Sequence, residues 1–146
     1  MKINVHAWGA GFEDLADQVV HMLHEIQGSN YFRSHAAPTW KPRVNVYETP
    51  TRYLLCVELA GVSADQIDVR TEGGSLHVRG ARDKPEVPDV ARPEFEAGDV
   101  SVHQMEIDSG RFHRTLKLAQ DVNLDDIQAL YRHGYLWIIL PRRGGE

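Results

Sequence analysis

The hydrophobic pattern changes near residue 43, and this change most restricts the possible folds. From Arg43 onward, apolar and polar residues alternate over short runs separated by turn residues. Alternation with a period of two lets one face of a β-strand enter a core while the other meets water. Eight such runs and one earlier helical segment predict an all-β sandwich rather than a parallel α/β sheet. The runs are RVNVYET, RYLLCVEL, IDVRTE, SLHVRG, VSVHQMEI, GRFHRTLKL, DIQALYR and GYLWIILP.

The clearest hairpin lies between residues 67 and 80. Apolar positions alternate there with polar ones, and Gly73-Gly74 stand in the middle. Two adjacent glycines can take the positive φ values that a tight hairpin turn needs. We therefore expect two antiparallel strands joined at this pair.

The last run, Tyr135 to Pro141, is apolar on both faces of the expected strand. Leu136, Ile138 and Leu140 share one face and suit the core, which leaves an outer stripe of Tyr135, Trp137 and Ile139. A bare apolar stripe on an outer face invites association with other apolar surfaces. We expect an N-terminal arm to cover it at rest, through the stripe of a helix or through Trp40.

That arm has a helical pattern over residues 12–27. Glu13 and Asp14 favour a helix start, and Gly28 favours its end. One apolar stripe recurs at steps of three and four, made of Phe12, Leu15, Ala16, Val19, Met22, Leu23 and Ile26. The stripe either docks on the sandwich or is displayed part of the time as a protein-binding surface.

Residues 82–99 predict a long, acidic, mobile loop. They contain three prolines, three basic residues and six acidic residues, so few of them can enter a core. Loops of this length without secondary structure usually have a function.

The composition excludes several classes of function. Cys56 is the only cysteine and suits a reducing compartment. The chain shows neither a signal peptide nor a run of about 20 apolar residues, so we expect a soluble, cytoplasmic protein with no membrane partner. A net charge of −5 argues against nucleic acid as a partner, although protonating all eight histidines would raise that charge to +3.

No motif for enzyme chemistry is apparent. The chain lacks both the phosphate-binding glycine loop and the Gly-x-Ser-x-Gly elbow. His21 and His24 lie three apart on the expected helix, with His6 and His35 on either side, and such a pair can share a metal. Without a clear third and fourth ligand, we interpret them as solvated side chains, so no metal, cofactor or catalytic residue is expected.

Arg114 is more informative because its face of the expected strand is otherwise apolar. It shares that face with Phe112, Leu116 and Leu118. An unpaired buried charge is costly, so the arginine must either keep its head group in water or find a carboxylate. The residues alone leave both interpretations open.

Taken in order, several segments resemble the small heat shock proteins of the α-crystallin (Hsp20) family. They are YETPTRYLLCVELAGVSADQIDV, LHVRGAR and GRFHRTLKLAQDVNLDDIQALYRHGYLWIILP. Ala60 and Ala119 stand where the family usually has proline, and Tyr135 is larger than usual within Gly-x-Leu. Large assemblies in this family use an Ile-x-Ile/Val motif in the tail, which residues 142–146 lack.

The resemblance implies an arm of residues 1–42, an immunoglobulin-like α-crystallin domain of residues 43–141 and a short tail of residues 142–146. It also implies a homodimer in which a loop strand pairs with the partner's sheet, and small rather than large assemblies. Arg114 would find its carboxylate at or near that interface. The expected strand contributes Val100, Val102, His103, Met105 and Ile107.

The resemblance further implies a chaperone that binds unfolding proteins without ATP and prevents their aggregation. The expected client-binding residues of the arm are Trp8, Phe12, Leu15, Val19, Met22, Leu23, Ile26, Tyr31, Phe32 and Trp40. The alternative is a p23-like co-chaperone or binding module that acts on a single partner. A metal-binding or enzymatic protein is a third class, which rests on the histidines alone.

Overall fold

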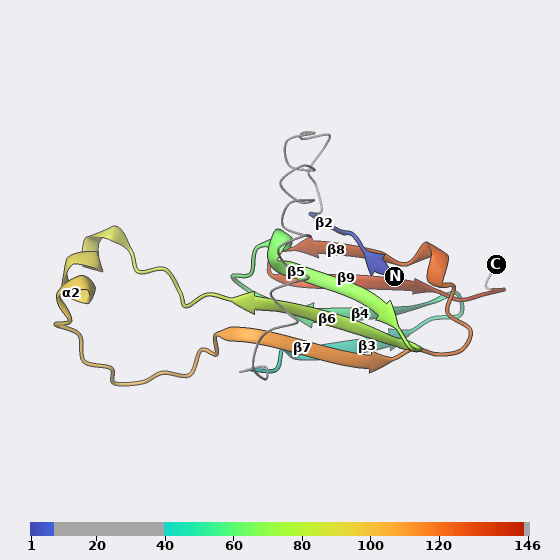
Figure 1. Ribbon diagram of the computed structural model, residues 1–146, viewed down its shortest axis with the longest axis horizontal. Coiled ribbons are helices and arrows are strands. Elements are labelled where there is room, and N and C mark those ends of the chain that lie inside the picture. Colours follow the sequence, from blue (N-terminus) through green and yellow to red (C-terminus); the bar gives the residue numbers. More distant parts are fainter. Residues whose placement is uncertain (8–39, 145–146) are drawn as a thin grey trace.

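The computed structural model describes residues 1–7 and 40–144, and these form a two-layered β-sandwich (Figure 1). One sheet has the strand order β1-β5-β6-β7 and the other β2-β8-β9-β4-β3. All neighbouring strands are antiparallel except β2 and β8. The strands are β1 Lys2–Ile3, β2 Val5–Ala7, β3 Val44–Glu48, β4 Arg52–Glu58, β5 Ile67–Glu72, β6 Ser75–Arg82, β7 Gly110–Lys117, β8 Gln128–Arg132 and β9 Tyr135–Pro141.

This architecture confirms the expected β-sandwich. Seven of the eight expected runs form β3 to β9, whereas residues 100–107, the run VSVHQMEI, take no regular secondary structure. A strand needs a neighbour to satisfy its backbone groups, and these residues have none among residues 1–7 and 40–144. The helix expected over residues 12–27 lies outside the described residues.

The core follows from the alternation in the sequence. In β9, Leu136, Ile138 and Leu140 are buried, as expected, while the residues between them are not. They meet residues of the other sheet such as Val78 and Phe112. Burying one such side chain stabilises the fold by roughly 1.5–3 kcal/mol.

Residues 1–7 lie within the sheets, not in an arm as the sequence suggested. Lys2 and Ile3 pair with Arg70 and Val69 of β5, whereas Val5 to Ala7 run parallel to β8. The same short segment therefore continues one edge of both sheets. Ile3 and Val5 are each 5% exposed and belong to the core.

Two turns depend on glycine. Gly73 and Gly74 both have positive φ and join β5 to β6, which confirms the expected hairpin. Gly134, with φ of 80°, lies in the turn between β8 and β9, where a Cβ atom would come within 2.9 Å of the Ala60 Cα. A side chain at Gly134 would thus clash with the backbone that follows β4.

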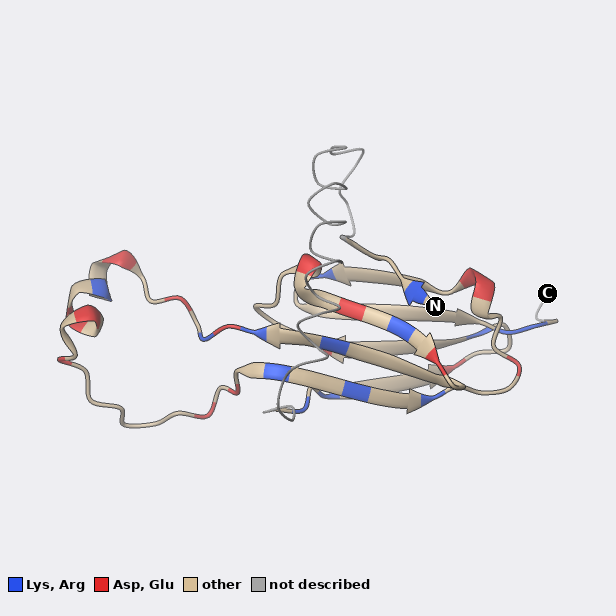
Figure 2. Ribbon diagram, in the orientation of Figure 1, with Lys and Arg blue, Asp and Glu red and all other residues tan. Residues whose placement is uncertain are grey.

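The loop between β6 and β7 extends away from the sandwich (Figure 1). It contains a short helix, α2, at Arg92–Ala97, which the sequence did not predict. The helix ends at Gly98, whose left-handed conformation is typical of helix ends. Acidic residues recur along this loop (Figure 2). Short 3-10 helices lie at Ala64–Gln66, Asp89–Ala91 and Leu124–Asp126.

Candidate interaction surfaces

The outer face of the five-stranded sheet carries an apolar surface, which we call the outer patch. Tyr135, Trp137 and Ile139 of β9 point outward, as the sequence predicted, and Tyr135 is 49% exposed. Register places Leu54, Cys56 and Leu130 on the same face. The patch consists of Tyr47, Leu54, Cys56, Leu130, Tyr135, Trp137 and Ile139.

Part of the patch is covered by a neighbouring strand. Tyr47 of β3 stacks on Trp137, with ring centroids 6.2 Å apart and planes inclined by 24°. The expected helix stripe lies outside the described residues, so its contact with the patch stays a prediction. Burial raises the pKa of the Cys56 thiol within the patch, which keeps it protonated at neutral pH.

Trp40 does not cover the outer patch, contrary to one of the two expected ways of covering it. Its indole lies against Phe112 of the other sheet, with ring centroids 5.4 Å apart in an edge-to-face arrangement. Its Nε1 donates a hydrogen bond to the Gly110 carbonyl at 2.8 Å, and the Arg82 guanidinium lies 3.9 Å from the ring centroid. The Trp40 side chain therefore packs at the edge formed by β7.

These contacts form part of a loop base, defined by Trp40, Arg82, Asp108 and Gly110. Arg82 Nε and Nη2 both donate to the Asp108 carbonyl, at 2.9 and 2.6 Å. Register pairs Arg82 directly with Gly110. The two ends of the loop are thus held side by side.

β3 is an edge strand, because within the described chain it pairs only with β4. Val46 is 58% exposed although its position in the register belongs to the inner face of the sheet. An open edge with an exposed apolar side chain is a template for another strand.

The loop offers a segment that such an edge could accept. Val102, Met105 and Ile107 are 63%, 73% and 66% exposed. Val100 is also exposed, and so is His103. The structure thus places five of the expected interface residues on a segment that pairs with no described strand, and their pairing with a second chain stays a prediction.

Arg114 lies at the sandwich edge and is partly buried, on the same face as Phe112 and Leu116. Its Nη1 donates to the carbonyl of Pro42, a fully buried residue. Within residues 1–7 and 40–144, no carboxylate lies at ion-pair distance from Arg114. A carboxylate partner from a second chain stays a prediction.

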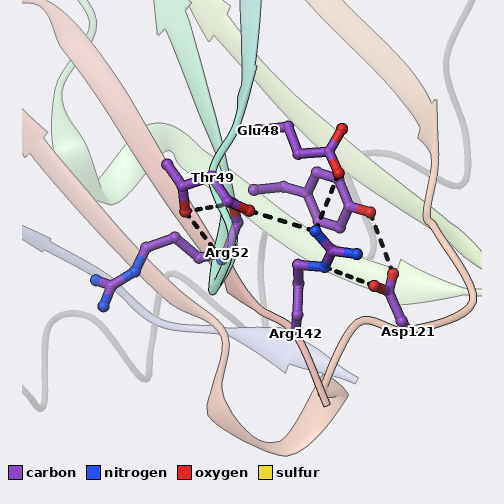
Figure 3. Close-up of polar contacts among 6 residues, drawn as sticks. Glu48, Thr49, Arg52, Asp121 and Arg142 are labelled. Atoms are coloured by element: carbon purple, nitrogen blue, oxygen red, sulfur yellow. Dashed lines mark hydrogen bonds and ion pairs between the residues drawn. The ribbon is translucent and has the colours of Figure 1, made fainter. Parts of the chain in front are cut away.

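A separate ion-pair network ties the end of β9 to the β3–β4 hairpin (Figure 3). Arg142 Nε donates to Asp121 Oδ2 at 2.6 Å, and Nη1 donates to Glu48 Oε1 at 3.0 Å. The Arg142 hydrogen bond lowers the pKa of Asp121, whose other oxygen accepts from the Tyr53 hydroxyl at 3.2 Å. The network therefore fixes one end of the edge strand β3.

Two histidines meet on the outer face of the four-stranded sheet. His77 Nδ1 lies 3.0 Å from His113 Nε2, which also accepts a hydrogen bond from Arg79 Nε at 3.2 Å. Burial, then Arg79 and His77, lower the pKa of His113. Among the residues placed by the structure, no group of three or more His, Cys, Asp or Glu could hold a metal ion.

Most of the expected client-binding residues fall outside the described part of the chain, and Trp40 alone is placed. His21, His24 and His35 also lie outside it, while His6 is exposed on β2. Sequence reasoning missed the burial of Ile3 and Val5, although their alternation with Lys2 and Asn4 was a strand signal. In the part of the chain that can be described, no helix is long and apolar enough to cross a membrane.

Comparison with known proteins agrees with this geometry. A heat shock protein of Dictyostelium discoideum is 29% identical over 108 residues, which cover 73% of this chain but only 24% of that protein. The 17.6 kDa class I heat shock protein of Helianthus annuus is 25% identical over 138 residues, covering 81% of this chain and 84% of the relative.

Two solved structures share the fold. The hspA structure from Xanthomonas axonopodis has a TM-score of 0.59 and 31% identity, and covers 73% of this chain and 98% of its own. A small heat-shock protein from Xylella fastidiosa has a TM-score of 0.60 and 29% identity, with 74% and 91% covered. The model of the Hsp20/alpha crystallin family matches residues 45–146. The chain therefore belongs to this family, the small heat shock proteins.

Proposed function

We propose that this protein is an ATP-independent holdase that binds unfolding proteins and prevents their aggregation. The observation that carries the proposal is the family match over residues 45–146. A protein that binds unfolded chains captures them before they associate with one another, which requires neither a bond change nor a nucleotide. The holdase needs apolar surface outside its own core.

The proposed client-binding surface consists of residues 8–39 of the arm together with the outer patch. The arm has more apolar side chains than a polar linker would have. In the outer patch, Tyr135 is about half exposed. Adaptable apolar segments can bind many different partners with low affinity per contact.

The proposed assembly starts from a homodimer in which residues 100–107 pair with the partner's β3. Two features support it: in the described part of the chain, β3 has an open edge, and Val102, Met105 and Ile107 are exposed without a strand partner. Pairing would remove the exposed edge, a known aggregation hazard. The Xylella relative is described as having a distinct high order structure, which agrees with assembly beyond one chain.

Light scattering of a heat-labile enzyme tests the function. Heated without ATP, the enzyme should scatter much less light when this protein is present at about one subunit per client. Serum albumin at equal mass serves as the control for crowding. Unchanged scattering at that ratio, or protection that appears only with ATP, would contradict the holdase proposal.

A further inference from the structure

The outer face of the four-stranded sheet is basic, and we call it the basic face. In its strands, alternate side chains enter the core and those between them point outward. The outward side chains include five basic and two acidic residues, although the whole chain has a net charge of −5. Figure 2 shows basic residues on β5, β6 and β7 of this sheet. The basic and histidine side chains of the face are Lys2, Arg70, His77, Arg79, Arg111, His113 and Lys117.

The two carboxylates of the face both lie on β5. Asp68 forms an ion pair of 2.9 Å with Arg70 of the same strand, whereas β6 and β7 present no outward Asp or Glu. Arg79 Nε donates instead to His113 Nε2, at 3.2 Å. Within residues 1–7 and 40–144, no carboxylate lies at ion-pair distance from Arg79 or Lys117. The described chain therefore leaves positive charge on β6 and β7 without a negative partner.

The loop between β6 and β7 carries the opposite charge. Residues 83–99 include six acidic and two basic residues. One of the basic residues, Arg92, forms ion pairs of 3.4 and 2.6 Å with two carboxylates of the loop itself. Glu94, Glu96 and Asp99 are exposed and form no ion pair with any residue that the structure describes. Carboxylates on and beside α2 are thus available to a positively charged surface.

The loop extends away from the basic face of its own chain. The loop base holds the two ends of the loop together at Arg82 and Gly110, and the loop continues from there beyond the sandwich (Figure 1). Lys117 lies at the other end of β7, about 23 Å from Gly110 along the strand. The loop of a second copy does not start from this base, so it can approach the whole length of the face.

We propose that the basic face is a docking site for residues 83–99 of a second copy of this chain. Opposite charges on the two surfaces favour this contact, and like charges disfavour contact between two faces or two loops. An exposed ion pair is weak alone, so docking needs several pairs and the high local concentration of loops that an assembly provides. The contact is made by side-chain charges, so it requires neither the pairing of residues 100–107 with β3 nor holdase activity.

Cross-linking of mixed isotopes tests the docking. Unlabelled protein and protein labelled with heavy nitrogen are unfolded in urea and refolded together, so that copies combine at random. A carbodiimide then joins carboxylates to amines in contact with them, and Lys117 supplies an exposed amine on the face. We expect peptides in which Lys117 of one isotope is joined to residues 83–99 of the other. Their yield should be about five-fold lower in about 0.5 M NaCl than in about 0.02 M, because salt screens exposed charges.

Charge reversal tests whether the two surfaces recognise each other. A face variant carries Arg79→Glu and Lys117→Glu, and a loop variant carries Glu94→Lys, Glu96→Lys and Asp99→Lys. In either variant alone, the face and the loop have the same sign, so cross-links between face and loop peptides should fall to background. Mixing the two variants should restore them, because the reversed face then meets a reversed loop.

The control variant carries Arg52→Glu and Arg132→Glu, which change the net charge as the face variant does but lie on the other sheet. It should cross-link like the unmodified protein, and circular dichroism checks that every variant is folded. The proposal is overturned if Lys117 is joined only to its own copy, only to residues 8–39, or to no carboxylate. It is also overturned if the mixture of folded variants stays at background. No client is present, so these outcomes leave the holdase proposal untouched.

Discussion

Arg114 shows that sequence can place a side chain on the correct face without identifying the group that it binds. It lies on the apolar face, as expected, but its head group binds the Pro42 carbonyl. Arg114→Ala would leave the carbonyl of this buried residue without its donor, which costs about 1–3 kcal/mol. We expect a lower Tm in thermal unfolding, by less than the loss of a fully buried ion pair would cause.

Lys117→Ala is the matched control, because Lys117 is exposed on the same strand. Sedimentation of the Arg114→Ala protein would separate the two possible roles of the arginine. A weaker dimer indicates that Arg114 also binds a carboxylate of the partner. An unchanged Tm would show that the bond to Pro42 contributes nothing measurable.

His113 should make the stability of the fold depend on pH. Burial, Arg79 and His77 lower its pKa below the ordinary 6.5, so the unfolded chain binds a proton at a higher pH than the folded chain does. This contribution is present above the unfolded pKa, and is lost as pH falls through it and down to the folded pKa. The groups facing the imidazole are His77, Arg79 and Thr115.

His113→Gln keeps an acceptor for Arg79 and removes the titration. We expect the fall in Tm between about pH 7.5 and pH 5 to be smaller in this variant than in the unmodified protein. His6→Gln, at an exposed position on β2, is the control. An identical pH dependence in all three proteins would assign the acid sensitivity to other groups.

Residue-level prediction succeeded where one local pattern determined the outcome. Alternation alone placed Leu136 and Ile138 in the core and Trp137 outside it. It failed where the partner is distant in sequence: Trp40 meets Phe112, and Arg142 joins Asp121 and Glu48. Such contacts depend on how the sheets stack. The hydrophobic period of a strand carries no information about that stacking.

At the scale of elements, the loop segment 100–107 has the sequence of a strand but needs a neighbouring strand before it can form one. It has the alternation of a strand but takes no regular structure here, since a strand forms only beside a neighbour. Met105→Pro would remove a backbone N–H that can donate to a ladder with a partner strand. We expect sedimentation equilibrium to show dissociation toward monomer, with the Tm of the sandwich nearly unchanged.

Met105→Ala controls for loss of the side chain alone, because it keeps the backbone N–H. Successive N–H groups of a strand point to opposite sides, so Gln104→Pro is measured in parallel and at least one of the two proline variants removes a ladder donor. If the dimer stays intact in both variants, residues 100–107 are not the interface.

Short elements were the hardest to predict. Ile3-Asn4-Val5 alternates apolar and polar residues, but a two-residue strand such as β1 is too short for its periodicity to be distinctive. The helix α2 has six residues and lies in a proline-rich acidic segment, whose pattern predicts a loop. Longer elements, the strands β3 to β9, repeat their period often enough to be predicted.

At the scale of the whole molecule, residues 1–7 belong to the sandwich and not to the arm. Deleting residues 1–40 would also remove β1 and β2 from the core. We therefore predict the effect of replacing residues 8–39 with a Gly/Ser linker of equal length. The protein should still fold and dimerise, and should lose most of its ability to suppress scattering by a heated client.

A linker of the same length with residues 12–27 restored provides the matched comparison, because it returns the helix stripe alone. Recovery of protection would assign client binding to that stripe. Full protection by the Gly/Ser variant without residues 12–27 would instead show that the arm is not the client-binding surface.

The loop base allows the loop between β6 and β7 to change in length. Arg82 and Gly110 are neighbours in register, so the sandwich already holds the two ends of the loop together whatever lies between them. The entropy of closing a flexible loop grows only with the logarithm of its length, and doubling that length costs about 0.6 kcal/mol. Insertions and deletions between these ends are therefore nearly neutral for folding. The distance over which one subunit reaches another can change by evolution while the fold stays constant.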